Sequence, residues 1–145
     1  MANVSKLLDK KGKEIVSVSP DAGIRDAIAK MAEKSVGTAL VMDGNKLVGI
    51  LAERDFIRKV YLKDLCGKST KVREIMSTNL TTVKPETTLE SCMELMTDRR
   101  IRHLPVVDGD RVVGVISIGD LVKFMILEKE FVIKNLQSYI AGPGM

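Results

Sequence analysis

The stretch Val112-Val113-Gly114-Val115-Ile116-Ser117-Ile118-Gly119-Asp120 decides the fold, because the chain contains it twice. The earlier copy, 65 positions upstream, is Leu47-Val48-Gly49-Ile50-Leu51-Ala52-Glu53-Arg54-Asp55. In both copies a short apolar run rich in β-branched residues leads to an Asp, and an amphipathic run follows. This pattern predicts a buried strand that turns sharply into a helix, with the Asp in the first helical turn. The free N–H groups and the positive dipole end of such a helix suit an anion or a sugar phosphate.

The repeat extends far beyond this stretch. At the same spacing, Ile15–Val60 aligns with Leu80–Met125 without a gap. Turn-forming residues stay in register, as in Pro20 with Pro85 and the pair Asp43-Gly44 with Asp108-Gly109. A chance alignment would not keep every turn residue in place, so the sequence predicts an internal duplication.

Each copy predicts the element order β-α-β-β-α. A short strand (15–18 and 80–83) precedes a helix that begins after a proline and carries apolar residues at spacings of three and four. A hairpin with an Asp-Gly turn follows, with strands at 39–42 and 46–51 in the first copy and at 104–107 and 111–116 in the second. The second helix begins near Asp55 or Asp120. The predicted fold class is therefore α/β (α+β), with tandem β-α-β-β-α repeats related by pseudo-two-fold symmetry.

The segments outside the aligned copies are also interpretable. Residues 4–8 and 72–76 are expected to be lead-in strands or turns, each belonging to the copy that it precedes, and 61–71 reads as a polar connector. The second helix of the second copy is expected to run on through Phe131 and Ile133 towards Tyr139, and residues 141–144 end it. Its surplus apolar residues predict a subunit interface. Packing back on its own repeat is the alternative.

Composition narrows the class of protein. With 145 residues the chain forms one compact domain or two small repeats that share a core, and its apolar stretches are too short for a transmembrane helix. The first residues lack the apolar core of a signal peptide, which predicts a cytoplasmic location. Cys66 and Cys92 are accordingly expected to be reduced thiols. The net charge of +4 is a mild bias towards anionic partners, but 3% aromatic residues argue against a nucleic-acid binder. No metal-ligand or catalytic motif points to an enzyme.

The doubled β-α-β-β-α with Gly-x-x-Ser-x-x-Asp at its second helix closely resembles the cystathionine β-synthase (CBS) domain pair, or Bateman module. The resemblance rests on residues 48–55, 82–85, 102–108 and 113–120 and covers about residues 4–127. It divides the chain into repeat 1 (4–62), repeat 2 (72–127) and a C-terminal helix extension (128–145) that forms a dimer contact. It implies a regulatory module, with no required cofactor, that binds an adenosine compound between the repeats. The implied ligands are AMP, ADP or ATP, and less often S-adenosylmethionine or NAD. The implied partners are a second copy and a separate regulated protein, without a membrane.

The residue types of the repeat suit such a ligand. Asp120 can accept hydrogen bonds from both hydroxyls of a ribose, and Ser117 can donate to a phosphate beside the helix start. Backbone edges at Thr81-Thr82 and Arg102–Leu104 can read adenine, and Arg102 and His103 are placed for phosphate charge. The expected nucleotide-binding residues are Asp120, Ser117, Arg102, His103, Leu104, Thr81, Thr82, Asp55, Arg54, Thr38, Val16 and Ser17.

Ser117, Asp120 and His103 also have simpler explanations. Ser117 and Asp120 form a capping box that stabilises the helix by about 1 kcal/mol without any ligand, and His103 can be a surface residue. At the positions of Ser117 and Arg102-His103 the first copy has Ala52 and Gly37-Thr38. We therefore expect one competent site around Asp120 and a weaker or empty one around Asp55. A module that only dimerises or scaffolds, with its pockets unoccupied, is the alternative function.

Overall fold

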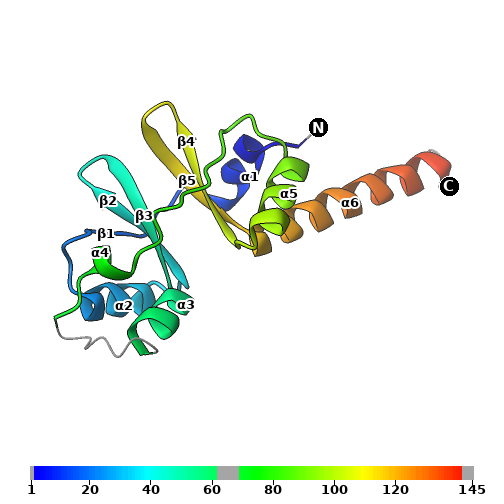
Figure 1. Cartoon of the computed structure of the whole chain (residues 1–145). Coiled ribbons are helices and arrows are strands. Elements are labelled where there is room, and N and C mark those ends of the chain that lie inside the picture. The colour runs from blue at the N-terminus through cyan, green and yellow to red at the C-terminus, as the bar shows by residue number, and fades with distance from the viewer. Residues whose placement is uncertain (1, 62–68, 142–145) are drawn as a thin grey trace.

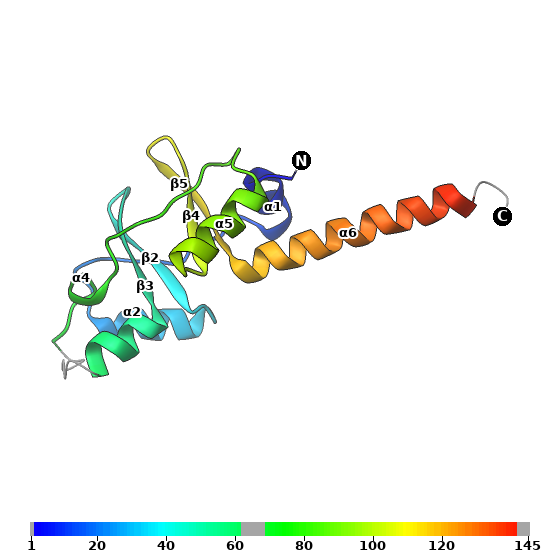
Figure 2. The same ribbon diagram turned by 45° about the vertical axis from the view of Figure 1, so that its right-hand side comes forward.

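The computed structural model describes residues 2–61 and 69–141. Figures 1 and 2 show two hairpin-and-helix units side by side, with one long helix leaving the second unit. The elements in chain order are α1 (Val4–Lys11), β1 (Ser17–Val18), α2 (Ile24–Glu33), β2 (Thr38–Asp43), β3 (Lys46–Ala52), α3 (Glu53–Asp55), the π-helical turn η1 (Phe56–Tyr61), α4 (Val72–Ile75), α5 (Leu89–Arg99), β4 (His103–Asp108), β5 (Arg111–Ser117) and α6 (Ile118–Ala141). Residues 62–68 of the expected connector, with Cys66, and residues 142–144 at the expected helix end lie outside the described residues.

The two hairpins confirm the predicted duplication. Strand β2 pairs antiparallel with β3, and β4 pairs with β5 in the same manner. The register shifts between Val41 and Met42 in one hairpin and between Val106 and Val107 in the other, which are equivalent positions of the repeat. The turn glycines Gly44 and Gly109 have φ values of 62° and 63°, a conformation that glycine adopts without strain. The fold is the predicted tandem α+β repeat.

The first helix of each copy also lies where the sequence predicted it. Thr88 caps α5 by accepting a hydrogen bond from the Ser91 backbone N–H at 3.2 Å. Helix α2 is followed by Ser35 and α5 by Arg100, both with left-handed φ values, 55° and 54°. The apolar residues of both helices face their own hairpins and are buried: Ile24, Ala27, Met31, Leu89, Cys92 and Met96. Met31 and Met96 are therefore core residues.

The opening strand of each copy is shorter than predicted. In the first copy only Ser17–Val18 forms a strand, which pairs parallel with β2. In the second copy the predicted strand at 80–83 is reduced to a single parallel bridge between Val83 and Val106. Before this bridge the Leu80 N–H donates to the Thr78 carbonyl at 3.0 Å, so this backbone donor is used locally and not in the sheet.

The lead-in segments differ from the prediction in both structure and position. Residues 4–8 belong to helix α1 and residues 72–75 to helix α4, whereas strands or turns were expected. Each of these helices packs on the other copy. Val4, Leu7 and Leu8 lie in the core of the second copy, and Val72 and Ile75 lie in the core of the first.

Backbone hydrogen bonds fix this exchange in the same way at both ends. Val4 and Ser5 donate to the carbonyls of Thr87 and Pro85 at 2.9 and 2.8 Å. Val72 and Arg73 donate to the carbonyls of Ala22 and Pro20 at 3.0 and 2.9 Å, which are the equivalent acceptors of the first copy. The exchange therefore follows the pseudo-symmetry of the repeat.

The glycine shared by both hairpins makes room for the exchanged helices. A Cβ atom on Gly114 would lie 2.8 Å from Cδ2 of Leu8 in α1, and one on Gly49 would lie 2.6 Å from Sδ of Met76 after α4. Carbon atoms in ordinary contact are about 3.5–4.0 Å apart. Glycine is thus required at both positions by a close approach and not by a turn.

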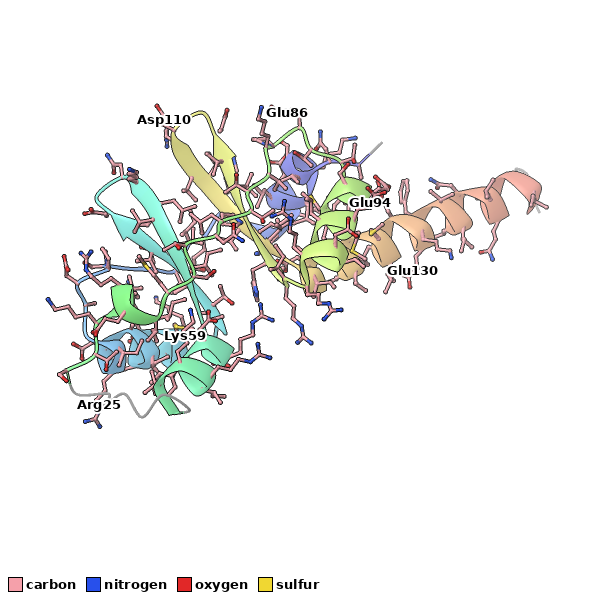
Figure 3. All side chains as sticks on the ribbon, in the orientation of Figure 1. Arg25, Lys59, Glu86, Glu94, Asp110 and Glu130 are labelled. Atoms are coloured by element: carbon pink, nitrogen blue, oxygen red, sulfur yellow. The ribbon has the colours of Figure 1, made fainter. Side chains whose placement is uncertain are left out.

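Helix α6 runs on as expected but does not fold back on its repeat. Its first turns contact α1, α5 and β5, and its distal half stands clear of the body in both views. Beyond Glu130, which is labelled in Figure 3, large apolar side chains are exposed: Phe131 at 65%, Leu136 at 55% and Ile140 at 80%. No helix within the described residues is long and apolar enough to span a membrane.

Candidate functional site

Two cavities of similar size lie between the repeats. The first, of about 490 Å³, is lined by residues that include Asp55, and we call it the Asp55 cavity. The second, of about 450 Å³, is lined by residues that include Asp120, and we call it the Asp120 cavity. Each takes lining residues from both copies, and their volumes lie within the range of small-molecule sites. The duplication has therefore produced a pair of cavities.

The contact between Thr38 and His103 marks the centre of the pair. These residues occupy equivalent positions of the repeat, and Oγ1 of Thr38 lies 3.1 Å from Nδ1 of His103. Both line both cavities. Burial lowers the pKa of His103, and the charge of Lys11 lowers it further, while Asp120 opposes these effects. At neutral pH the ring between the cavities is therefore uncharged.

Asp120 lies in the first turn of α6, as predicted, and forms a reciprocal cap with Ser117. The Ser117 backbone N–H donates to Oδ2 of Asp120 at 2.9 Å, and the Asp120 N–H donates to Oγ of Ser117 at 3.1 Å. The capping role is thus confirmed. It leaves the second carboxylate oxygen, Oδ1, without a hydrogen-bond partner among the residues that the structure describes.

A lysine from the other end of the chain also holds this carboxylate. Nζ of Lys11, the last residue of α1, lies 2.6 Å from Oδ2 of Asp120 and also donates to the Val115 carbonyl. Burial raises the pKa of Asp120, but the hydrogen bonds from Lys11 and Ser117 outweigh burial, so that the pKa lies below its ordinary value. Asp120 is therefore an ionised acceptor with a cation already beside it.

Asp55 is held more loosely. Its Oδ2 accepts the Ala52 N–H at 3.3 Å, and Ala52 has no hydroxyl to complete the reciprocal cap. The start of each second helix is otherwise tied in the same way. The Glu53 N–H donates to the Gly37 carbonyl at 3.0 Å, and the Ile118 N–H donates to the Arg102 carbonyl at 2.9 Å.

All the arginines that line the two cavities belong to the Asp55 cavity. Arg54, Arg58 and Arg102 all line it, and no acidic group lies within 4 Å of any of them in the described part of the chain. Figure 3 shows nitrogen-tipped side chains projecting into the gap between the two units. Unpaired guanidinium groups at a helix start are suited to bind phosphate oxygens.

Most of the residues predicted from the sequence line one of these cavities. The Asp120 cavity includes Val16, Thr38, His103, Ser117 and Asp120, and the Asp55 cavity includes Arg54, Asp55, Thr81 and Arg102 together with Thr38 and His103. The others lie elsewhere. Leu104 is a core residue with 0% exposure, Thr82 is exposed outside both linings, and Ser17 lines a separate surface hollow beside α2.

The predicted grouping of these residues is wrong. Arg102 and Thr81 were expected to serve the same site as Asp120, yet they line the cavity of Asp55. The physical reason is the Thr38–His103 contact, which brings the strand starts of the two copies face to face. Arg102 therefore lines the cavity of Asp55, although its carbonyl accepts the Ile118 N–H at the helix start of its own copy. The replacement of Arg102 by Gly37 in the first copy consequently says nothing about the strength of the Asp55 cavity.

Three cationic residues of the cavities, Arg58, Lys11 and Lys34, were not singled out from the sequence. Arg58 follows Arg54 by four positions, which places both on one helix face, so the spacing contained a usable signal. Lys11 offered none, because its acceptor Val115 lies 104 residues away along the chain.

The fold is a duplicated α+β module with a pair of cavities between its copies. The family model for the CBS domain matches residues 8–62 and 72–127. The chain therefore belongs to the CBS domain family, and a pair of CBS domains is a regulatory module.

Relatives and solved structures agree with this assignment. The CBS domain-containing protein CBSX3, mitochondrial, of Arabidopsis thaliana is 36% identical over 96% of this chain and 72% of its own length. The crystal structure of the CBS domain protein NE2398 is 48% identical, with a TM-score of 0.83 over 86% of this chain and 98% of that one. A candidate signal-transduction protein with CBS domains from Burkholderia ambifaria MC40-6 is 44% identical, with a TM-score of 0.83 over 87% and 95% of the two chains.

One structural neighbour was crystallised with adenosine compounds. The CBS domain pair of protein MJ0100 was solved in complex with 5′-methylthioadenosine and S-adenosyl-L-methionine. It is 24% identical, with a TM-score of 0.77 over 88% of this chain and 98% of that one. At this identity the likeness establishes the shared fold.

Proposed function

We propose that this chain is a sensor that binds an adenine nucleotide of the AMP, ADP or ATP class between its CBS repeats and signals to a separate protein. One observation carries the proposal. Each cavity combines the helix-start carboxylate of one copy with the strand start of the other, so a bound molecule bridges the two copies. Binding can therefore change their relative position, which is what a regulatory module must convert into a signal.

The chemistry of the cavities supports a nucleotide. A helix-start carboxylate can accept hydrogen bonds from ribose hydroxyls, and the cations beside it can bind phosphate. The three arginines of the Asp55 cavity favour it for a diphosphate or triphosphate. This reverses the ranking expected from the sequence, because Asp120 already has a cation of its own. The ligands of the MJ0100 pair are adenosine compounds as well.

Calorimetric titration of AMP, ADP, ATP and S-adenosylmethionine tests the proposal. We expect Asp55→Asn and Arg58→Gln to weaken ATP binding by about tenfold or more, since each removes a charged partner worth roughly 1.4 kcal/mol or more. Arg25→Gln is the matched control, because Figure 3 shows Arg25 at the far end of the first unit. If none of the nucleotides binds or raises the melting temperature, the sensor proposal fails.

The second candidate function is a ligand-free assembly module. The apolar face of α6 specifically favours it, since Phe131, Leu136 and Ile140 are at least half exposed. A homodimer through this helix is compatible with both functions. A dimer that persists while every nucleotide leaves the melting temperature unchanged would favour the scaffold.

The proposed role needs no catalysis by the chain itself and no required cofactor. The regulated partner is a separate protein, which affinity capture with and without ATP can identify by its nucleotide-dependent retention. We propose that the module acts in the cytoplasm. The relative CBSX3 is mitochondrial by name, so fractionation of the native cells, with detection in the organelle-free fraction, checks this location.

A further inference from the structure

The two cavities differ most in how their helix-start carboxylate is neutralised. In the Asp120 cavity the ammonium of Lys11 lies 2.6 Å from Oδ2 of Asp120, and the two side chains are only 32% and 27% exposed. In the Asp55 cavity no ion pair to Asp55 is present within the described residues. The Asp120 cavity thus contains its own counter-ion, whereas the Asp55 cavity has free arginines.

Lys11 reaches this position because α1 is longer than its counterpart. Helix α1 has eight residues and α4 has four. After α4 the chain turns away, and the Ser77 N–H donates to the Ile50 carbonyl at 2.8 Å. The equivalent carbonyl of the second copy, that of Val115, accepts from the ammonium of Lys11 instead. In the second copy the extra turn of α1 therefore puts the ammonium of Lys11 where the first copy has a backbone N–H, that of Ser77.

The base of this side chain is fixed by the packing of α1, and its end is held only by the Asp120 carboxylate and the Val115 carbonyl. Leu7 and Leu8, immediately before it, are buried at 1% and 2% exposure in the core of the second copy. Gly12, with φ of 101°, ends the helix, and the Gly12 N–H donates to the Leu8 carbonyl at 2.8 Å. Lys11 and Gly12 both line the Asp120 cavity. Rotation of the lysine side chain can hence move the ammonium within the cavity without moving the helix.

From this geometry we infer that Lys11 makes the Asp120 cavity selective for adenosine compounds that carry phosphate over those that carry none. The inference rests on the proposed function. A ribose that binds Asp120 must share or displace the ammonium. A phosphate on the same ligand gives the displaced ammonium a new partner, whereas adenosine leaves it partly buried and unpaired. An unpaired charge is the element that discriminates against the wrong ligand.

The other charged groups of the cavity do not supply this discrimination by themselves. Glu14 and Lys34 also line it and have opposite charges, and His103 is neutral because burial and the nearby cations lower its pKa. Lys11 is the cation that contacts the carboxylate directly.

The test is a calorimetric titration of AMP and adenosine in an Asp55→Asn background, which leaves the Asp120 cavity to be measured. We expect AMP to bind about tenfold more tightly than adenosine when Lys11 is present. Lys11→Met keeps the length of the side chain but removes its charge, and it should tighten adenosine binding and reduce the ratio to about threefold or less. Lys11→Arg and the neighbouring control Lys10→Met should keep the original ratio.

The outcomes separate the two proposals. If both ligands bind and Lys11→Met leaves the ratio unchanged, the selectivity inference is wrong and the sensor proposal stands. If AMP and adenosine do not bind the Asp120 cavity but ADP or ATP binds the unmodified protein, the inference fails and the sensor proposal stands. If AMP, ADP, ATP and adenosine all fail to bind the unmodified protein, both proposals fail. Circular dichroism melts of each variant confirm that the titrated protein is folded.

Discussion

Replacing Gly114 with alanine tests whether α1 is part of the second copy. The new Cβ would lie 2.8 and 3.0 Å from the two terminal methyl carbons of Leu8, roughly 0.7 Å closer than ordinary carbon contacts. Leu8 is 2% exposed and cannot move towards solvent. We expect overpacking to cost about 1–3 kcal/mol, offset in part by roughly 0.4–1 kcal/mol from the stiffer unfolded chain. For a chain of this size the melting temperature should fall by about 2–8 °C.

A double-mutant cycle in urea unfolding assigns this loss to the contact. Leu8→Ala alone should cost about 2–5 kcal/mol. In the double variant the alanine methyl occupies part of the vacated space, so the two losses should sum to more than the measured total by about 0.5–3 kcal/mol. Gly37→Ala is the control, because its Cβ meets only the Glu53 side chain, with Oε2 at 3.6 Å and Cδ at 3.8 Å. Additivity within about 0.5 kcal/mol would refute the packing of α1 against β5.

Three further predictions concern His103, Cys92 and α6. Because burial lowers the folded pKa of His103, the unfolded chain takes up the proton first, so stability should fall as the pH drops through about 6.5. His103→Gln should reduce this loss in urea titrations at pH 7.5 and 5.5, and an equal pH dependence would contradict the burial of the ring. Burial raises the pKa of Cys92 to about 11, so iodoacetamide at pH 8 should leave this thiol unmodified in the native protein, as mass spectrometry can check. Alkylation of Cys92 as fast as in the denatured protein would show that the core is open. Truncation after Leu127 should change the molar mass measured by light scattering from that of a dimer to that of a monomer and leave the melting transition in place. A truncated chain that still has the mass of a dimer would exclude α6 as the dimer contact.

The local pattern of the sequence was sufficient for the hairpins and for the two helices of each copy, but not for α1, α4 or the strand at 80–83. The spacing of apolar residues in 24–31 and the Asp-Gly turns depend only on near neighbours in the chain, so these helices and hairpins lie where predicted. The position of Asp55 and Asp120 in a first helical turn is local in the same sense, and so is the cap with Ser117.

What could not be predicted depends on contacts between the copies. An amphipathic segment such as 4–8 shows that one face is buried, but its pattern does not say which of two similar cores it joins. The same ambiguity misplaced Arg102, since only the arrangement of the two copies shows that it lines the Asp55 cavity. Lys11 is the extreme case, because nothing near it in sequence indicates a carboxylate on α6.

The exchange of α1 and α4 has a consequence for how the chain can be divided. If the chain is cut between the repeats, each half carries the helix that packs on the core of the other half. Neither fragment then contains all the elements of one complete core. Removing residues 2–11 should expose the core of the second copy and leave α4 packed on the core of the first. In a protein with one copy only, the same geometry requires a second molecule to donate the missing helix, and the duplicated chain supplies that donor within itself.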